Sequence, residues 1–494
     1  MSNPPSHNFA ARLLGRLGEN SSLVEAASGN TLRAAEVVSQ IAGFAARFLN
    51  AGARPGDRVL LSCGINPMSA LAYFGAIYAG LVPVLLDERT HAASGHLVNA
   101  KVRAKAVWSA KPIRQDWTIQ AGVPILEGEC TAVDPASLQP FPAGQDDLAV
   151  LMPTSGSTGI PRFVKVSHGN LTANTEAIIR SQRLGSDETA LLIMPISYCF
   201  GASVLHTHLY QGGSVVFDAR FMFPDKVLHS INDYGCTSFA GVPTVYNILL
   251  RRSNVRAMTF PTLRRFLQAG GGLAPQSIEE MRSIVPGAEF FVMYGQTEAT
   301  ARISCLPPER LSDKLGSAGV PLEKLKLRIV DDQGHDLPEG HAGHVLVSGS
   351  SVCEGYFDEP EASREKFCDG WLKTGDVGLL DKDGYLWIQG RTSDFIKIRG
   401  YRVGLADVEA RVGAVAGVGD CAATGVQHPE AGEALAIFVV PDESYTGSNG
   451  TASLTDRVRQ ALPSQWTCSS VKVVSELPRT VNGKIARSQL QTLA

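Results

Sequence analysis

Short apolar runs alternate with longer amphipathic segments through the first half of the chain. Residues Leu32–Leu49 repeat apolar side chains at helical spacing, and several short apolar runs separate this segment from others like it. The runs predicted to be strands are Arg58–Ser62, Leu81–Leu86, Ala106–Trp108, Leu148–Met152, Thr189–Met194 and Ser214–Phe217. Helices that alternate with short buried strands are typical of α/β architecture with parallel sheets.

The pattern changes in the second half of the chain. Leu325–Val330, His344–Ser348 and Tyr385–Gln389 are predicted to be antiparallel strands, separated by turns that contain Asp and Gly. We expect them to form a small β-rich subdomain of a large N-terminal domain, residues 1–390. Residues 391–494 have the size of one small α+β domain.

Within that smaller domain, Phe395–Ile398 is predicted to be a strand, followed by a loop over 399–402. The segment Ser444–Ser453 is polar and rich in Gly and Ser, which predicts a surface loop.

Composition narrows the class of protein. The 494 residues are 44% hydrophobic and 19% charged, as in a globular protein with a large core. A net charge of −3 gives no electrostatic reason to expect nucleic acid or an anionic membrane as partner. Nine cysteines without a C-x-x-C pair, and a polar segment Met1–Ala10, favour a cytoplasmic enzyme without a signal peptide. Glycines and a proline interrupt the apolar stretch Ile65–Leu86, which predicts a packed helix and strand rather than a membrane span.

The most informative segment is Thr154–Arg162, which follows the predicted strand Leu148–Met152. It contains four hydroxyl side chains and two glycines, then Pro161 and Arg162. Hydroxyl donors on a flexible backbone suit a polyphosphate, and Arg162 adds positive charge. A plain surface turn is the alternative for this segment alone. The Walker pattern, which ends in Gly-Lys-Ser/Thr, does not occur here.

Further clusters follow in order along the chain. Ala269–Leu273 is a glycine run after a strand, where backbone could lie flat against a ring. Tyr294–Glu298 combines an aromatic ring, a hydroxyl and a carboxylate, and Thr374–Asp376 offers a carboxylate to a diol. Arg391 and Asp394 stand at the expected domain junction, and Pro478–Lys484 presents one lysine. Each cluster alone could be an ordinary turn or a solvated charge, and only their conjunction argues for a site.

With these motifs in this order, the chain resembles the adenylate-forming enzymes. That superfamily includes acyl- and aryl-CoA synthetases, adenylation domains of peptide synthetases and firefly luciferase. The resemblance extends from about Thr31 to Arg487. It implies ATP-dependent activation of a carboxylic acid to an acyl-adenylate, with release of pyrophosphate, followed by acyl transfer to coenzyme A after rotation of the small domain.

The resemblance also implies roles for individual residues. Thr297 would contact the α-phosphate, Glu298 would hold Mg²⁺, and Lys484 would contact the acid carboxylate and the α-phosphate. Asp394 would be the hinge, and Gly400 would border the tunnel for the thiol arm. The residues that would bind ATP are Thr154, Ser155, Gly156, Ser157, Thr158, Gly159, Arg162, Gly270, Gly271, Gly272, Tyr294, Asp376 and Arg391. Two departures affect the phosphate loop: Arg162 stands where the family usually has lysine, and Phe163 where it usually has glycine.

The acid pocket is expected around the segment Ile196–Ser203. The residues expected to line it are Tyr198, Phe200, Ser203, His206, Phe239, Gly241 and Met293. This set is mostly apolar, which fits an acid with an aliphatic or aromatic body. Amino-acid-activating relatives have aspartate at the position of Gly201, so the glycine argues against an ordinary α-amino acid.

Several functions remain open at this stage. The favoured one is an acid–CoA ligase with ATP and Mg²⁺, or a variant that loads a carrier protein. An amide ligase that passes the acyl group to an amine is the second. A non-catalytic binding protein of the same fold is the third, although Glu298, Asp376 and Lys484 are all present. Because no carrier sequence follows Lys484, we expect a stand-alone enzyme.

Overall fold

The computed structural model divides the chain into two compact units. The larger unit comprises Met1–His341, Val345–Thr374 and Leu379–Trp387, and the smaller one Ala342–His344, Gly375–Gly378 and Ile388–Ala494. The residues that the structure describes are 6–90, 92–112, 122–154, 161–398, 401–429, 431–442, 450–464, 466–478, 485 and 487–494. The assignment of 1–390 and 391–494 to two functional domains stays a prediction.

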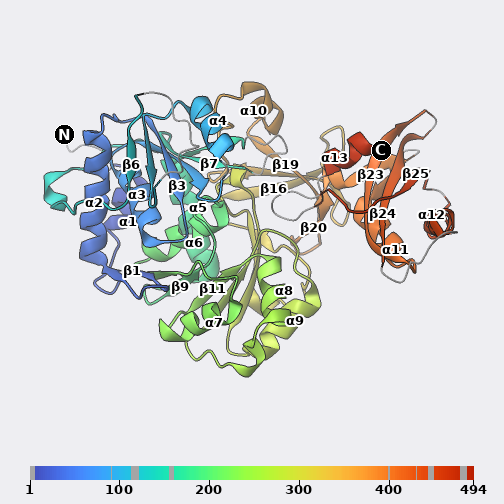
Figure 1. Ribbon diagram of the computed structural model, residues 1–494, viewed down its shortest axis with the longest axis horizontal. Coiled ribbons are helices and arrows are strands. Elements are labelled where there is room, and N and C mark those ends of the chain that lie inside the picture. The colour runs from blue at the N-terminus through green and yellow to red at the C-terminus, as the bar shows by residue number, and fades with distance from the viewer. Residues whose placement is uncertain are drawn as a thin grey trace. The chain divides into compact units, whose positions relative to one another are not determined.

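One sheet of the larger unit has the strand order β6-β5-β3-β4-β7-β8 (Figure 1). Its strands are β3 (Arg58–Cys63), β4 (Val82–Asp87), β5 (Ala106–Ser109), β6 (Ile125–Glu127), β7 (Leu148–Pro153) and β8 (Phe163–Ser167). Strand β3 runs parallel to both β4 and β5, and β8 closes the edge antiparallel to β7. Strands β3, β4 and β5 are buried on both faces, as expected of parallel strands covered by helices.

A second sheet has the order β15-β14-β13-β12-β11-β9-β10-β1-β2. Its strands are β1 (Ser22–Glu25), β2 (Thr31–Arg33), β9 (Thr189–Leu192), β10 (Ser214–Phe217), β11 (Ser238–Gly241), β12 (Arg265–Gln268), β13 (Glu289–Tyr294), β14 (Ser304–Leu306) and β15 (Val320–Pro321). The central strands are parallel, and the chain turns back antiparallel from β13 into β14. This reversal after Tyr294 positions much of the candidate site.

Helices of the larger unit cover these sheets. Helix α5 packs against β7 and β8, α6 packs against β9 and β10, and the two helices contact each other between the sheets (Figure 1). The helices of this unit are α1 (Phe9–Leu14), α2 (Ala34–Asn50), α3 (Pro67–Tyr78), α4 (Ala92–Val102), α5 (His168–Gln182), α6 (Cys199–Tyr210), α7 (Pro224–Asp233), α8 (Pro243–Arg252), α9 (Pro275–Ile284) and α10 (Pro360–Lys366). Helix α6, buried along its whole length, carries Phe200, Ser203 and His206 of the expected acid pocket.

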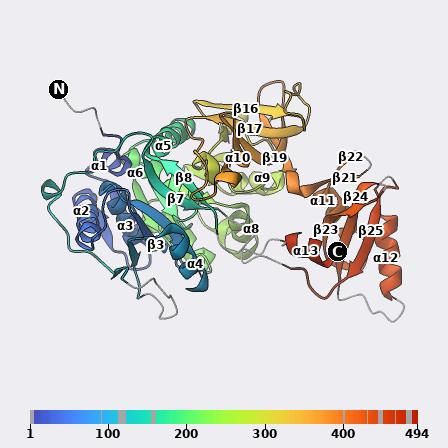
Figure 2. The ribbon, with the colours of Figure 1, turned by 90° about the horizontal axis from the view of Figure 1, so that it is seen from above.

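The β-rich part has the strand order β16-β17-β19-β18, with β20 beside β19. Figure 2 shows β16 and β17 side by side. The bounds are β16 (Leu325–Val330), β17 (Gly343–Gly349), β18 (Phe367–Cys368), β19 (Trp371–Leu380) and β20 (Leu386–Arg391).

The smaller unit is built on a sheet of order β22-β21-β24-β23, with β25 beside β24. Its elements are β21 (Phe395–Ile398), β22 (Tyr401–Gly404), α11 (Leu405–Gly413), β23 (Val418–His428), β24 (Gly432–Pro441), α12 (Gly450–Gln460), β25 (Cys468–Val473) and α13 (Arg487–Leu493). Strand β24 alternates between two cores: Leu435 and Ile437 pack with α11 and α12, while Phe438 packs with Leu490 of α13. Helices therefore cover both faces of this sheet.

Most predicted elements lie where the pattern places them, with three corrections. Residues 32–33 belong to strand β2, so the helix begins at Ala34, where the Glu36 carboxylate accepts the Arg33 N–H at 2.8 Å. Tyr401 and Arg402 begin strand β22 rather than forming a loop. Gly450–Ser453 begin helix α12, although their composition predicted a loop. Among the described residues, no helix combines the length and apolarity needed to cross a membrane.

Candidate active site

The ends of the predicted phosphate loop are joined by backbone hydrogen bonds. Strands β7 and β8 form a hairpin in which Pro153 pairs with Phe163, and the Thr154 N–H donates to the Arg162 carbonyl at 2.8 Å. Ser155, Gly156, Ser157, Thr158 and Gly159 lie outside the described residues. The two ends of the connection between β7 and β8 are therefore held side by side, next to a buried strand. Ends held in this way suit a loop that folds around an anion.

The two residues that depart from the family pattern have defined partners. Arg162 is half-exposed and pairs with Glu359, Nε to Oε2 at 2.9 Å. Its guanidinium also lies 5.5 Å from the ring centroid of Tyr356. Phe163 is fully buried in the core of this sheet. A glycine at 163 would leave a cavity there, so the phenylalanine serves packing.

Tyr294–Glu298 forms a tight reversal at the end of β13. A Cβ on Gly295 would lie 1.9 Å from the Ala301 carbonyl oxygen, so only glycine fits this position. Residues Thr297–Ala299 form a short 3₁₀ helix. The Glu298 Oε1 atom accepts a 2.7 Å hydrogen bond from the hydroxyl of Tyr356, which is 6% exposed. The hydrogen bond from Tyr356 therefore fixes the orientation of the Glu298 carboxylate.

Thr300, two residues further on, has φ 66° and ψ −63°. The Ala301 N–H donates to the Ala299 carbonyl at 2.7 Å across it, which makes this a γ-turn of the rare, strained kind. The Thr300 hydroxyl donates to the Ser351 carbonyl at 2.7 Å and anchors the turn. Strain of this type occurs mostly at functional sites.

Asp376 and Arg391 meet within the smaller unit. Asp376 follows Gly375 in strand β19 and is 3% exposed, and the Arg391 Nε lies 2.8 Å from its Oδ1. The Asp394 carboxylate accepts the Arg391 backbone N–H at 3.1 Å and lies 3.4 Å from the Arg487 Nε. The expected ribose ligands and the expected hinge thus form one charged network. Lys484 and Gly400 lie outside the described residues.

The glycine run lies beside the start of helix α6. Gly270 has φ +85°, and a Cβ there would lie 2.6 Å from the hydroxyl of Tyr198. Gly271 lies against Pro243, whereas a Cβ on Gly272 would meet no atom of the described residues within 4 Å. The structure therefore brings a residue expected in the acid pocket to the run expected at the adenine edge.

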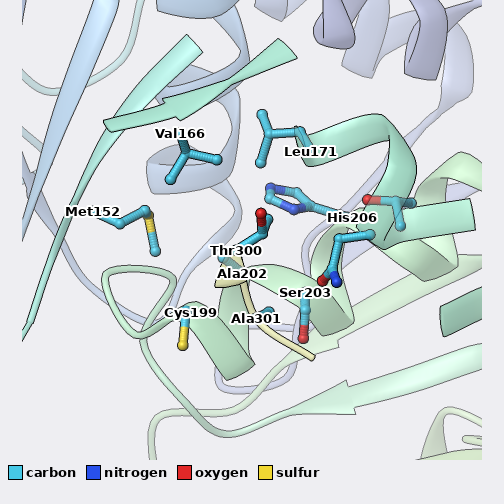
Figure 3. A pocket seen from close by; sticks show the side chains of 11 residues that line it. Met152, Val166, Leu171, Cys199, Ala202, Ser203, His206, Thr300 and Ala301 are labelled. Carbon is cyan, nitrogen blue, oxygen red and sulfur yellow. The ribbon is translucent and has the colours of Figure 1, made fainter. Parts of the chain in front are cut away.

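A small cavity of about 10 Å³, room for about one water molecule, adjoins helix α6. Figure 3 shows Cys199, Ser203 and His206 of α6 around it, with Thr300 and Ala301 from the reversal after β13. His206 is buried, its Nε2 lies 3.1 Å from the Tyr73 hydroxyl, and burial lowers its pKa to about 3. The imidazole is therefore neutral at physiological pH and acts as a hydrogen-bonding part of the wall.

The other residues expected in the acid pocket lie elsewhere around β11 and β13. Phe239 packs in an aromatic cluster with Tyr246 and Phe266, and a Cβ on Gly241 would meet Val245. Met293 lies 3.0 Å from the Gln182 amide nitrogen, sulfur to nitrogen. Of the described residues that line the cavity, none is one of Phe239, Gly241 and Met293.

Sequence reasoning missed Arg302, which is 2% exposed. Its guanidinium carbon lies 4.6 Å from the ring centroid of Phe200, and its Nη2 lies 3.4 Å from the Ser203 hydroxyl. The available signal was a single cation between Ala301 and Ile303, in a segment otherwise without charge.

The fold and the order of these motifs are those of the adenylate-forming class of enzymes. The chain belongs to the AMP-binding enzyme family, whose model matches residues 16–357, and the model of the AMP-binding enzyme C-terminal domain matches residues 407–484. The resemblance and the α/β fold class are thereby confirmed.

Relatives and solved structures agree with this assignment. The chain is 32% identical to feruloyl-CoA synthase of an Amycolatopsis species, with 94% of each chain covered. It is 32% identical to 2-succinylbenzoate–CoA ligase of Bacillus subtilis (strain 168), covering 70% of this chain and 69% of the relative. ATP-bound MatB from Rhodopseudomonas palustris superposes with a TM-score of 0.83 at 26% identity, with 99% of each chain covered. The o-succinylbenzoate CoA synthetase of Bacillus subtilis, solved with ATP and a magnesium ion, gives 0.82 at 25%, covering 98% of this chain and 99% of the other.

Proposed function

We propose that this enzyme activates a carboxylic acid without an α-ammonium group as its acyl-adenylate and then transfers the acyl group to coenzyme A. The observation that carries the proposal is the geometry of Glu298: a half-buried carboxylate at a strand end, oriented by the buried hydroxyl of Tyr356. The names of the relatives, which are CoA ligases, support thioester formation as the second step.

The residues present fit a magnesium ion that arrives with ATP. Among the described residues, no three His, Cys, Asp or Glu side chains gather in a way that could hold a metal by themselves. Mg²⁺ is commonly bound by one or two carboxylates together with substrate phosphates and water. Glu298 would hold it, and the bound ion would neutralise charge on the departing pyrophosphate.

The first half-reaction joins two anions, so the protein must supply positive charge and alignment. The acid carboxylate attacks the α-phosphorus, and the bond to pyrophosphate breaks. In this proposal Lys484 contacts both reactants, Thr297 donates to the α-phosphate, and the loop 154–159 surrounds the β- and γ-phosphates. Arg162 contributes charge at the end of that loop, where its pairing with Glu359 limits how far it can move.

Three groups of residues would hold the nucleoside. Tyr294 would stack on adenine, and the open space beside Gly272 would receive the edge of the ring. The Asp376 carboxylate, whose Oδ1 lies 2.8 Å from the Arg391 Nε, would accept hydrogen bonds from the ribose hydroxyls.

The shape of the chain at Gly201 supports an acid without an α-ammonium group. A Cβ at Gly201 would lie 2.4 Å from the Pro195 carbonyl oxygen. Helix α6 therefore has no room for an aspartate at the position where amino-acid-activating relatives carry one. Phe200 and the buried, neutral His206 provide a mainly apolar surface, which favours an aliphatic or aromatic body.

Mass analysis of the reaction products tests the proposal. The purified chain is incubated with a pooled panel of carboxylic acids, ATP and Mg²⁺, with and without coenzyme A. We expect a new acyl-CoA that depends on ATP, and its mass identifies the acid. Acyl-adenylate that accumulates and does not respond to coenzyme A would instead indicate an amine or a carrier protein as acceptor. The absence of any product from any acid would contradict the function itself.

A further inference from the structure

Arg302 is a buried cation for which the described part of the chain offers no anionic partner. Its side chain lies in the segment that returns from β13 to β14 and is 2% exposed. Among the described residues, no carboxylate lies within ion-pair distance of its guanidinium, and its Nε is buried without a hydrogen-bond acceptor. An unpaired buried charge is costly, so proteins normally place a counter-charge beside it.

The titratable groups around Arg302 supply no negative charge at physiological pH. They are the thiols of Cys199 and Cys305 and the phenol of Tyr198. Burial raises the pKa of the Cys305 thiol and of the Tyr198 phenol to about 12, and it raises the pKa of Cys199 as well. All three groups are therefore protonated, and no described group compensates the charge of the guanidinium.

The surrounding residues hold Arg302 in a fixed position. The side-chain amide of Asn174 bonds to both its backbone groups, donating to the carbonyl at 2.8 Å and accepting from the N–H at 3.2 Å. The guanidinium carbon lies 4.6 Å from the centroid of the Phe200 ring. The only side-chain hydrogen bond in the described structure is the long contact of 3.4 Å from Nη2 to the Ser203 hydroxyl. A fixed guanidinium with unused donors is prepared for a planar oxyanion.

This guanidinium adjoins the wall of the expected acid pocket. Ser203, which accepts from Arg302, also lines the small cavity shown in Figure 3, together with Ala301, its neighbour in sequence. Phe200 and Ser203 both lie on helix α6. The unused donors of Arg302 therefore lie beside residues expected to line the pocket for the body of the acid substrate.

We propose that Arg302 binds a second anionic group of the acid substrate, so that the substrate class is dicarboxylic acids or acids with a comparable oxyanion such as a sulfonate. The substrate would supply the counter-charge that the enzyme lacks. This inference rests on the proposed function, because it names the acid that the same site activates.

Matched pairs of acids test the inference. Each pair has one body, with and without a second carboxylate: adipate and hexanoate, phthalate isomers and benzoate, 3-(4-carboxyphenyl)propanoate and 3-phenylpropanoate. Pyrophosphate release gives kcat/KM for each acid. We expect the unmodified enzyme to prefer the diacid in at least one pair. Arg302→Met should lower kcat/KM for that diacid on the order of 100-fold, as for removal of one partner of a buried charge pair, and leave the monoacid nearly unchanged.

Two further variants separate recognition from folding. Arg302→Lys keeps the charge but not the planar fork, so it should retain part of the preference for the diacid. Arg310→Met, which removes an exposed arginine paired with Asp313, should leave both acids unaffected. As a readout independent of turnover, the diacid alone should raise the thermal midpoint of the unmodified enzyme and not that of Arg302→Met.

The outcomes distinguish the two proposals. Turnover of monoacids with no preference for any diacid would overturn the role of Arg302 and leave the ligase function intact. Equal losses for both members of a pair in Arg302→Met would also overturn it, because they would indicate a structural role or contact with the reacting carboxylate. Failure of every acid in the broad panel would count against the proposed function itself.

Discussion

The hydroxyl of Tyr356 donates a 2.7 Å hydrogen bond to the Oε1 atom of Glu298, 58 residues earlier in the chain. Burial raises the pKa of this phenol, and the nearby negative charge of Glu298 raises it further. The phenol therefore stays protonated and remains a donor over the physiological pH range. One face of the same ring lies 5.5 Å from the guanidinium of Arg162, so Tyr356 links the end of the phosphate loop to the proposed metal ligand.

Tyr356→Phe should weaken the binding of magnesium more than it lowers the stability of the fold. The ring keeps its packing against Phe367, at 5.7 Å between centroids. The charge-assisted hydrogen bond to Glu298 is lost, which is worth about 1.5–3 kcal/mol. We expect the Mg²⁺ concentration for half-maximal pyrophosphate release to rise roughly tenfold. Tyr385→Phe, whose ring lies beside Lys314, is the matched control and should titrate like the unmodified enzyme. An unchanged Mg²⁺ titration in Tyr356→Phe would dissociate this hydrogen bond from metal binding.

Gly272→Val should raise KM for ATP without destabilising the fold. A Cβ at this position would meet no atom of the described residues within 4 Å, so we expect the fold to accept a side chain there. If adenine lies along Gly270–Gly272, the added methyl groups overlap with the nucleotide, and we expect KM to rise about tenfold or more. Gly287→Val, at another open glycine, serves as the control. Steady-state kinetics with varied ATP provides the measurement, and equal KM values in both variants would place adenine elsewhere.

Local patterns predicted strands better than they predicted the chemistry around them. Ser214–Phe217 and Leu325–Val330 coincide with β10 and β16, because a short run of apolar or alternating residues has few other ways to be buried. Gly450–Ser453 read as a loop because their composition is polar, yet they begin a helix whose apolar face packs on the smaller sheet. Packing of the apolar face of this helix against the sheet determines that the segment is helical. The local sequence pattern carries no information about that packing.

In the candidate site, too, a local motif was predictable from the sequence, whereas contacts between distant segments were not. The motif at Tyr294–Glu298 is visible in the sequence because its residue types are adjacent. The contact between Tyr356 and Glu298 joins distant segments, so no spacing rule indicates it. Arg302 was missed for a different reason: its significance depends on which charges are missing around it, and that is a property of the folded neighbourhood alone.

Buried histidines should make the larger unit less stable as the pH falls below about 6.5. Burial lowers the pKa of His168, His206 and His208 to about 4, 3 and 4. In the unfolded chain these groups bind protons near pH 6.5, whereas in the folded chain they remain neutral until the pH falls much lower. The unfolded state therefore binds more protons in this window, and the free energy of unfolding decreases as the pH falls. Each histidine accounts for about 2 kcal/mol between pH 6.5 and 5.

Chemical denaturation at pH 5, 5.5, 6 and 6.5 measures this dependence before most carboxylates titrate. His206→Met, which removes one of the three groups, should reduce the slope of unfolding free energy against pH by about one proton. A slope that is flat over this range in the unmodified enzyme would mean that the histidines become protonated within the fold.

Lys484→Ala should separate the two half-reactions. In the proposed mechanism Lys484 contacts both anionic reactants of adenylation, so its loss removes charge where the transition state needs it. Removing one such group typically costs a factor of about 100 to 1,000 in rate. Formation of the acyl-adenylate should fall by that order, whereas thioester formation from supplied acyl-adenylate should stay largely intact. Lys472→Ala, in the same unit, removes a lysine bonded to the Leu493 and Ala494 carbonyls and serves as the control. Equal loss of both half-reactions in Lys484→Ala would refute a role confined to adenylation, because a residue that acts only on the α-phosphate has no reason to affect attack by the thiol.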